Sequence, residues 1–190
     1  MFIVGEASAD AHAAALIREL RKQSPDVRIF GAGGPQMKAA GMEMVLDLTE
    51  HAVVGLVEVL KNYGNFRRIF NDLLAEVGRR KPDGLVLVDF PGFNLRFAKA
   101  VKQRYPQTKI IYYISPQLWA WHASRARQIE RDVDLMLTIF PFEKDWYAKR
   151  APKLRVEFVG HPFADRVGQN SKFTIRNPQL VLLLPGSRER

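Results

Sequence analysis

The fold of this chain is decided by residues 109–121, which read KIIYYISPQLWAW. An apolar strand pattern over residues 109–114 runs directly into a loop that holds a proline and two of the three tryptophans. Such large side chains belong in a core or around a ligand, and loops at strand ends carry the chemistry of open α/β folds. The stretch therefore predicts part of an α/β enzyme, with its function at one edge of a sheet.

Alternating strand and helix patterns extend in both directions from this stretch. Residues 84–88 (GLVLV) form a continuous apolar run, which is typical of a strand buried on both faces of a parallel sheet. Further strands are expected at 2–4, 27–30, 44–46, 133–139 and 156–159, and helices at 9–22, 65–80, 93–104, 123–130 and 141–149. This alternation predicts a doubly wound parallel sheet of the Rossmann-like α/β class, with right-handed crossovers.

The pattern changes after residue 167. Residues 168–178 are polar and lack periodicity, so they predict a linker. Residues 179–184 again predict a buried strand, which ends in the sequence PGSRER. The expected organisation is one α/β domain over residues 1–167, the linker, and the first strand and turn of a mostly absent second α/β domain over residues 179–190.

The composition is that of an ordinary globular protein, with 47% hydrophobic and 26% charged residues among 190. No apolar run approaches the roughly 20 residues that cross a bilayer, and the chain has no cysteine for a disulfide or a thiolate metal site. A cytoplasmic protein is expected. The net charge of +9 favours anionic partners, although the basic residues are too scattered for a nucleic-acid-binding arm. A merely basic surface is the alternative.

The first loop, residues 5–10 (GEASAD), follows the first strand. Gly5 allows a tight turn close to a ligand, and Ser8 or Asp10 can cap the following helix. The carboxylates of Glu6 and Asp10 disfavour a pyrophosphate and suit a hydroxyl-rich ligand such as a sugar. Ordinary helix capping is the alternative.

The glycine-rich stretch at residues 31–35 (GAGGP) follows the second strand. The dinucleotide-binding fingerprint follows the first strand and lacks this proline, so NAD or FAD binding is not expected. Gly33 and Gly34 are predicted to allow a close approach by a ligand or by a neighbouring domain.

Asp89 stands directly after the apolar run of residues 84–88. A carboxylate there lies at the mouth of the crevice of a parallel sheet, and a partly apolar setting is expected to raise its pKa and suit it as a general base. A helix N-cap or a turn residue is the alternative. The four histidines have no zinc-ligand spacing, so no metal site is predicted.

Two apolar features suggest contacts with lipid or sugar. Trp119 and Trp121 either belong to the core or present aromatic faces to a sugar ring or an acyl chain. Residues 51–60 are apolar and precede a basic helix, so they predict either a membrane or lipid contact or a buried helix.

Taken together, these segments resemble the lipid-A-disaccharide synthase family of Gram-negative bacteria, which are glycosyltransferases with two Rossmann-like domains, the GT-B architecture. The matching stretches follow one another along nearly the whole chain: 5–10, 30–37, 53–60, 88–94, 113–121, 141–143 with Tyr147, 160–162 and 182–188. The resemblance implies the amino-terminal, acceptor-side domain of such an enzyme.

The resemblance further implies a reaction. The family transfers 2,3-diacylglucosamine from its UDP carrier to the 6-hydroxyl of 2,3-diacylglucosamine 1-phosphate, with inversion to a β-1,6 linkage, at the cytoplasmic face of the inner membrane. Asp89 matches the essential aspartate and would deprotonate the acceptor hydroxyl. No cofactor or metal is implied, and a homodimer is left open. The chain alone is expected to be inactive, because most of the nucleotide-binding domain is absent.

The resemblance assigns further residues by position. A donor-phosphate turn is implied at Gly186, Ser187 and Arg188, with Glu6 and Ser8 near the sugar and nucleotide. Acyl-chain or membrane contacts are implied at Val53, Val54, Leu56 and Val57, together with Trp119 and Trp121. The chain departs from the family pattern at Ala9, where glycine is usual, and at Gly92, where aspartate is common. Two rivals remain: a murein-type N-acetylglucosamine transferase, and a non-catalytic module that binds an anionic lipid or membrane surface.

Overall fold

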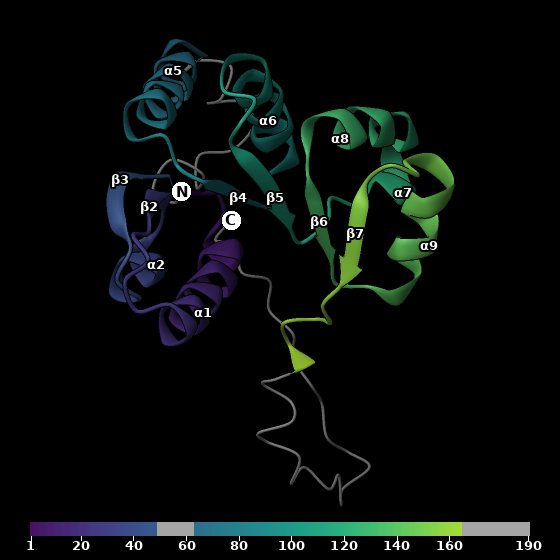
Figure 1. Ribbon diagram of the computed structural model, residues 1–190, viewed down its shortest axis with the longest axis horizontal. Coiled ribbons are helices and arrows are strands. Elements are labelled where there is room, and N and C mark those ends of the chain that lie inside the picture. Colours follow the sequence, from purple (N-terminus) through teal and green to yellow (C-terminus); the bar gives the residue numbers. More distant parts are fainter. Residues whose placement is uncertain (49–62, 165–190) are drawn as a thin grey trace, which may run out of the picture.

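The computed structural model describes residues 1–48 and 63–164, and in this part of the chain seven parallel strands form one sheet (Figure 1). The order across the sheet is β3-β2-β1-β4-β5-β6-β7. The strands are β1 (Phe2–Val4), β2 (Phe30–Gly33), β3 (Glu43–Asp47), β4 (Gly84–Val88), β5 (Lys109–Tyr113), β6 (Leu135–Thr138) and β7 (Arg155–Phe158). The predicted Rossmann-like α/β class is confirmed.

Helices cover both faces of this sheet. They are α1 (Ala7–Gln23), α2 (Pro35–Ala39), α5 (Tyr63–Arg80), α6 (Pro91–Arg104), α7 (Leu118–Trp121), α8 (Ala126–Asp132) and α9 (Pro141–Arg150), with a 3-10 turn at Ala123–Arg125. Helices α1 and α2 pack on one face, while α5, α6, α8 and α9 contribute to the core on the other (Figure 1). Right-handed crossovers produce this division, because the chain moves outward from β1 in one direction and then from β4 in the other.

The reversal of direction between β1 and β4 positions the functional edge of the sheet. Val4 at the end of β1 pairs with Val88 at the end of β4. In open parallel sheets the loops on either side of such a switch point diverge, and the crevice that forms at the carboxyl ends of the strands binds ligands. The loops that begin at Gly5 and at Asp89 are those two loops.

The predicted second strand over residues 27–30 was shifted in sequence. The strand runs over Phe30–Gly33, so Gly31 and Gly33 lie within β2 rather than in a loop after it. A Cβ atom on Gly31 would lie 2.0 Å from the carbonyl oxygen of Phe2 on β1, so only glycine fits there. The predicted pattern was misleading because glycine normally marks the end of a strand.

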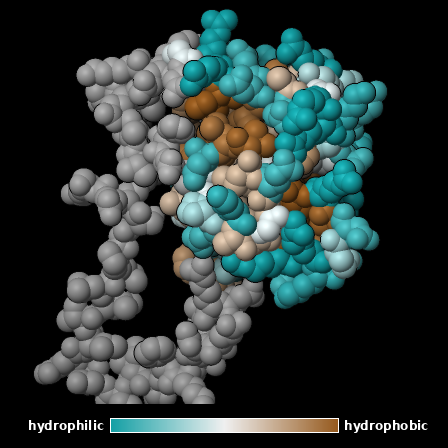
Figure 2. All heavy atoms as spheres, turned by 90° about the vertical axis from the view of Figure 1, so that its left-hand side faces the viewer, coloured by the Kyte–Doolittle hydropathy of each residue, from teal (hydrophilic) through white to brown (hydrophobic). Residues whose placement is uncertain are grey.

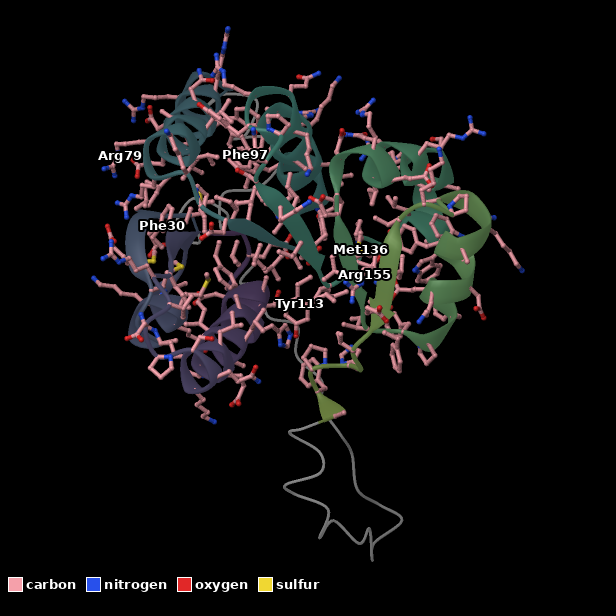
Figure 3. All side chains as sticks on the ribbon, viewed as in Figure 1. Phe30, Arg79, Phe97, Tyr113, Met136 and Arg155 are labelled. Carbon is pink, nitrogen blue, oxygen red and sulfur yellow. The ribbon has the colours of Figure 1, made fainter. Side chains whose placement is uncertain are left out.

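Two cores lie on opposite faces of the sheet. Phe97, on α6, belongs to the larger core, and Tyr113, on β5, lies beside α1 at the margin of the smaller one (Figure 3). Burial along β5 alternates, with Ile110 and Tyr112 fully buried and Ile111 and Tyr113 only half-buried. Two helices, α7 and α2, were not predicted, because four or five residues are too few to show helical periodicity.

Figure 2 looks onto the β3 side of the molecule and shows hydrophobic atoms gathered in the upper half of this face, next to a hydrophilic surface. Within the described ranges, no helix combines the length and the apolar character needed to cross a membrane.

Candidate active site at the carboxyl edge of the sheet

Backbone strain is concentrated where β4 and β5 end. Asp89 and Phe90 have φ values of 47° and 49°, and Ile114 has 63°. These are three of the four non-glycine residues with positive φ in the described part of the chain; the fourth is Lys81. Each such conformation costs about 1–3 kcal/mol, and residues of this kind cluster at active sites. The strain marks the ends of these two strands as the candidate functional site.

Buried side chains hold the strained turn at Asp89 in place. The carbonyl oxygen of Asp89 accepts hydrogen bonds from the Tyr112 hydroxyl at 2.6 Å and from the Asn94 Nδ2 amide at 2.8 Å. The Asp89 N–H donates to the carbonyl of Tyr113 at 3.3 Å. Burial raises the pKa of Tyr112 well above its usual value, so its hydroxyl stays a donor. The position of Asp89 is therefore fixed from both β5 and α6.

The Asp89 residue itself is half-buried, at the end of β4. The N-cap residue of α6 is Phe90, so the alternative that Asp89 is the helix N-cap is wrong. A carboxylate that is partly exposed at the switch point can meet a ligand in the crevice, and it is not sealed inside the core.

The first loop lies against the Asp89 turn. A Cβ atom on Gly5 would lie 2.4 Å from the ring of Phe90, so glycine is needed for this contact. Glu6 is half-buried and is the N-cap residue of α1, without a side-chain capping bond. Ser8 is exposed on the first turn of that helix. Glu6 and Asp89 therefore begin neighbouring loops, as expected for groups that share one ligand.

Asp10 caps a different helix from the one predicted. It is 2% exposed, and its carboxylate accepts hydrogen bonds from the backbone N–H groups of Gly34 (3.0 Å), Gln36 (2.9 Å) and Met37 (3.1 Å). The expectation that Ser8 or Asp10 caps α1 is wrong. Because both oxygens serve α2, the Asp10 carboxylate is structural.

The two predicted loop glycines make close contacts inside the domain. A Cβ atom on Gly33 would lie 2.4 Å from the sulfur of Met37, and the Gly34 N–H is bound by Asp10. The contact with Met37 requires glycine at position 33 without a ligand, whereas the hydrogen bond of Gly34 is one that any residue with an N–H can make.

An aromatic row follows the carboxyl ends of β5, β6 and β7. Trp119 is 39% exposed, so the core interpretation is wrong for this residue. Successive ring centroids lie 5.3 to 5.9 Å apart, and several rings are exposed. The members of the aromatic row are Trp119, Phe142, Phe140, His161, Phe163 and His12. Exposed aromatic faces on this edge suit stacking on a sugar or contact with an acyl chain.

Comparison with known proteins agrees with this geometry. The family model described as Lipid-A-disaccharide synthetase matches residues 1–190. The chain belongs to the lipid-A-disaccharide synthase family. The chain is 42% identical over 196 residues to lipid-A-disaccharide synthase 1 of Legionella pneumophila strain Philadelphia 1, covering 99% of the chain and 50% of that protein.

Two further relatives give the same result. The lipid-A-disaccharide synthase of Geobacter metallireducens is 43% identical, again over 99% of this chain and 50% of the relative. That of Nitrosococcus oceani is 45% identical over 98% of this chain and 49% of the relative. The chain spans about half the length of the curated relatives it matches.

Several residues predicted from the family resemblance lie outside the described residues. These are the linker and second-domain strand predicted over residues 168–190, and the side chains of Val53, Val54, Leu56, Val57, Gly186, Ser187 and Arg188. Trp121 belongs to α7, but its side chain is also outside the described part. Across residues 1–48 and 63–164, no group of three or more potential ligands that could hold a metal ion is found.

Sequence reasoning gave no role to the buried polar residues around this edge. Asn94, Ser115 and Glu143 are at most 5% exposed, and Tyr112 and Tyr147 are equally buried. The signals were available: Asn94 interrupts the apolar face of a helix, and Glu143 is the third residue of another. A glutamate at this position often bonds back to the backbone that precedes the helix.

A cavity of about 610 Å³ opens at the opposite edge of the sheet. Lys81, Asp83, Arg104 and Lys109 are among its lining residues, at the ends of α5 and α6 and the starts of β4 and β5. Parallel sheets bind their ligands at the carboxyl ends of the strands, so we place the family's reaction at the other edge.

Proposed function

We propose that the full-length protein containing this chain is an inverting glycosyltransferase of lipid A biosynthesis. It transfers 2,3-diacylglucosamine from a UDP carrier to the 6-hydroxyl of 2,3-diacylglucosamine 1-phosphate and forms a β-1,6 linkage. Membership in the lipid-A-disaccharide synthase family supports the class of reaction. The placement of Asp89 at the switch point of the sheet supports this chain as the acceptor-side domain.

In this proposal Asp89 is the general base. It removes the proton from the acceptor 6-hydroxyl while the resulting oxygen attacks the anomeric carbon and UDP leaves. A single displacement of this kind inverts the anomeric configuration and needs one well-placed base. The hydrogen bonds from Tyr112 and Asn94 to the Asp89 backbone support such placement.

The remaining roles follow the family pattern. Arg188, with Gly186 and Ser187, binds the donor phosphates, because a guanidinium fork suits paired phosphate oxygens. Glu6 and Ser8 approach the sugar and nucleotide from the loop beside Asp89.

The apolar positions take the lipid. Trp119 and Trp121 face the acceptor, and Val53, Val54, Leu56 and Val57 contact acyl chains or the cytoplasmic face of the inner membrane. The 190-residue chain by itself lacks transfer activity, because a complete GT-B donor site also needs the half of the relatives' length that this chain does not span.

The general-base role is tested by Asp89→Asn in the full-length protein. We expect a loss of at least about 10²-fold in kcat, since general-base catalysis contributes about 10²–10⁴-fold. Release of UDP and formation of disaccharide are measured, and Asp72→Asn on the exposed surface of α5 is the matched control. Full activity in a folded Asp89→Asn enzyme would remove Asp89 from this role.

The inactivity of the short chain is tested separately. Purified chain is assayed alone and after addition of the carboxyl-terminal half as a separate polypeptide. Activity that appears only with both halves supports the proposal, and turnover by the chain alone contradicts it.

A second candidate is a non-catalytic module that binds anionic lipid. The net charge of +9 and the exposed Arg67 and Arg68 on α5 favour it. Lipid binding without any transfer by the full-length protein would select this candidate.

A further inference from the structure

A buried polar cluster lies under the aromatic row and connects α9 to the loop after β5. The Tyr147 hydroxyl is 3.0 Å from the Ser115 hydroxyl, and both residues are at most 5% exposed. Glu143 stands one turn before Tyr147 on α9 and is 1% exposed. These three residues tie the start of α9 to the segment that leads into Trp119.

One oxygen of Glu143 is fully used. Its Oε2 atom accepts hydrogen bonds from the backbone N–H groups of Phe140 at 3.0 Å and Ile139 at 3.2 Å. This is the glutamate half of a capping box. The other half cannot form, because the N-cap residue Phe140 has no side-chain acceptor.

The other oxygen of Glu143 is buried and without a partner. In the described part of the chain only three buried side-chain atoms lack a hydrogen bond, and Glu143 Oε1 is one of them. Leaving a charged acceptor unpaired in this way costs more than about 1–3 kcal/mol, so such atoms call for an explanation.

The donors nearest to this oxygen come from the loop after β5. The side chains of Ser115 and Trp119 lie close enough to lower the pKa of Glu143, although neither completes a hydrogen bond to Oε1. Burial has a larger effect than these two side chains, so the pKa of Glu143 is raised. The Ser115 hydroxyl already has Tyr147 as a partner. The indole N–H of Trp119 is therefore the donor best placed to complete the cluster.

The Trp119 ring is partly exposed and contacts the ring of Phe142. Its ring meets that of Phe142 edge-on at 5.3 Å, while 39% of the residue is exposed at the carboxyl edge of the sheet. A hydrogen bond that such a ring gains only in the bound state adds its free energy to ligand binding.

We propose that Glu143 is a positioning residue for the acceptor: when a ligand covers Trp119, the indole N–H donates to Glu143 Oε1 and fixes the ring for stacking. The inference rests on the proposed function, in which Trp119 faces the acceptor. Glu143 itself touches no substrate, because only 1% of it is exposed.

The test uses the full-length protein, and the Trp119 signal is the part of its fluorescence that Trp119→Phe removes. Acrylamide quenching of Trp119 is measured with and without 2,3-diacylglucosamine 1-phosphate. In Glu143→Gln the amide oxygen takes the place of Oε2, which accepts from two backbone N–H groups, and the amide NH₂ takes the place of Oε1. The NH₂ group cannot accept a hydrogen bond from the indole N–H. Asp145→Asn, exposed on the same helix, is the matched control.

We expect the acceptor to shield Trp119 in the parent and in Asp145→Asn. In Glu143→Gln this shielding is reduced, and KM for the acceptor rises about two- to tenfold, the worth of one hydrogen bond, while KM for the donor is unchanged. Unchanged shielding and unchanged KM in a folded Glu143→Gln protein would overturn the proposal. Shielding that depends on Glu143 in a protein without transferase activity would instead overturn the proposed function and leave the positioning role intact.

A double-mutant cycle covers the case in which Glu143→Gln folds poorly. Trp119→Phe keeps an aromatic ring at this exposed position, and it removes the N–H donor together with the second ring of the indole. KM for the acceptor is compared in Trp119→Phe, Glu143→Gln and the double variant. If the two residues act through one hydrogen bond, KM for the acceptor in the double variant is no higher than in the single variants. If the two increases in KM multiply in the double variant, the residues act independently and the proposal is contradicted.

Discussion

At the scale of single residues, the site depends on a strained backbone that buried donors hold in place. Asp89, Phe90 and Ile114 adopt conformations that cost free energy, and Tyr112 and Asn94 offset this cost by binding the Asp89 carbonyl. Nothing in the local sequence around Asp89 predicts a left-handed conformation, because neither aspartate nor phenylalanine requires one.

The Tyr112 hydroxyl provides the first prediction. Tyr112→Phe removes one of the two side-chain donors to the Asp89 carbonyl and should lower the free energy of unfolding by about 0.5–1.5 kcal/mol. Transferase activity of the full-length protein should fall several-fold, because the turn that carries Asp89 relaxes. Urea unfolding and initial rates measure both effects. Tyr105→Phe, at the amino edge, should leave activity unchanged; equal losses in both variants would argue against a specific role.

Substitution by alanine should have opposite effects on stability at Gly5 and at Gly92. Gly5→Ala places a Cβ atom 2.4 Å from the Phe90 ring and should destabilise the protein by about 1–3 kcal/mol, as overpacking does. Gly92→Ala meets nothing within 4 Å, lies in the first turn of α6, and should stabilise it by about 0.4–1 kcal/mol. Thermal unfolding of the two variants and of wild type measures both changes in stability. A Gly5→Ala variant as stable as wild type would show that the Phe90 ring moves aside at little cost.

The buried carboxyl group of Glu143 predicts a pH dependence. Burial raises its pKa above the ordinary value of 4.5, so the protonated form stabilises the fold and this contribution is lost as pH rises through the raised pKa. Tyr147, the titratable neighbour on the same helix, has its pKa raised to about 12 by burial and stays neutral in this range. The free-energy advantage of wild type over Glu143→Gln should therefore shrink as pH increases from 4.5 to 8. A constant difference in urea-unfolding experiments would be inconsistent with this account.

At the scale of elements, contacts between distant segments decide how each helix and strand is anchored. Helix α2 is short, and its first N–H groups are satisfied by Asp10 from the preceding helix, 24 to 27 residues earlier. The sequence predicted a capping role for Asp10 but assigned it to α1 and not to α2, because local spacing cannot reveal a partner across a crossover.

Removal of this cap should be costly. Asp10→Ala leaves three backbone donors of α2 unpaired and should lower the free energy of unfolding by about 2–3 kcal/mol. Asp10→Asn keeps one carbonyl acceptor and should lose less. Asp26→Ala, exposed in the loop after α1, is the control for loss of a charge. An Asp10→Ala variant as stable as this control would show that water replaces the cap.

The strand positions were predicted correctly where the hydrophobic pattern of the sequence was strong. Residues 84–88 are apolar throughout and residues 110–113 are aliphatic or aromatic, and both stretches formed central strands. The predicted position of strand β2 was wrong, because Gly31 is required by the close approach of the β1 backbone and does not reflect a local preference for a loop. Asp89 and Trp119 could be identified from their places after strands, whereas Glu143, Asn94 and Tyr112 act through partners that the sequence does not place beside them.

At the scale of the whole molecule, charge and length govern the partners. The net charge of +9 should draw the chain to anionic membranes, with each basic group near the surface contributing about 1 kcal/mol. We expect the purified chain to bind phosphatidylglycerol vesicles and to leave them as salt rises and screens the attraction. Sedimentation with phosphatidylcholine vesicles is the control. Arg67→Glu with Arg68→Glu should weaken binding, and binding that is insensitive to salt and lipid charge would contradict an electrostatic contact.

The sequence by itself determined the α/β class, the parallel sheet and the strand ends that carry Asp89 and Trp119, because apolar periodicity and chain order are local properties. Only the tertiary structure decided that Asp10 caps α2, that Gly31 packs against β1, and that a buried oxygen of Glu143 lies near Trp119. The physical reason is that hydrogen bonds and close packing depend on distances between segments far apart in the chain. Those distances are set by how the crossovers fold back onto the sheet.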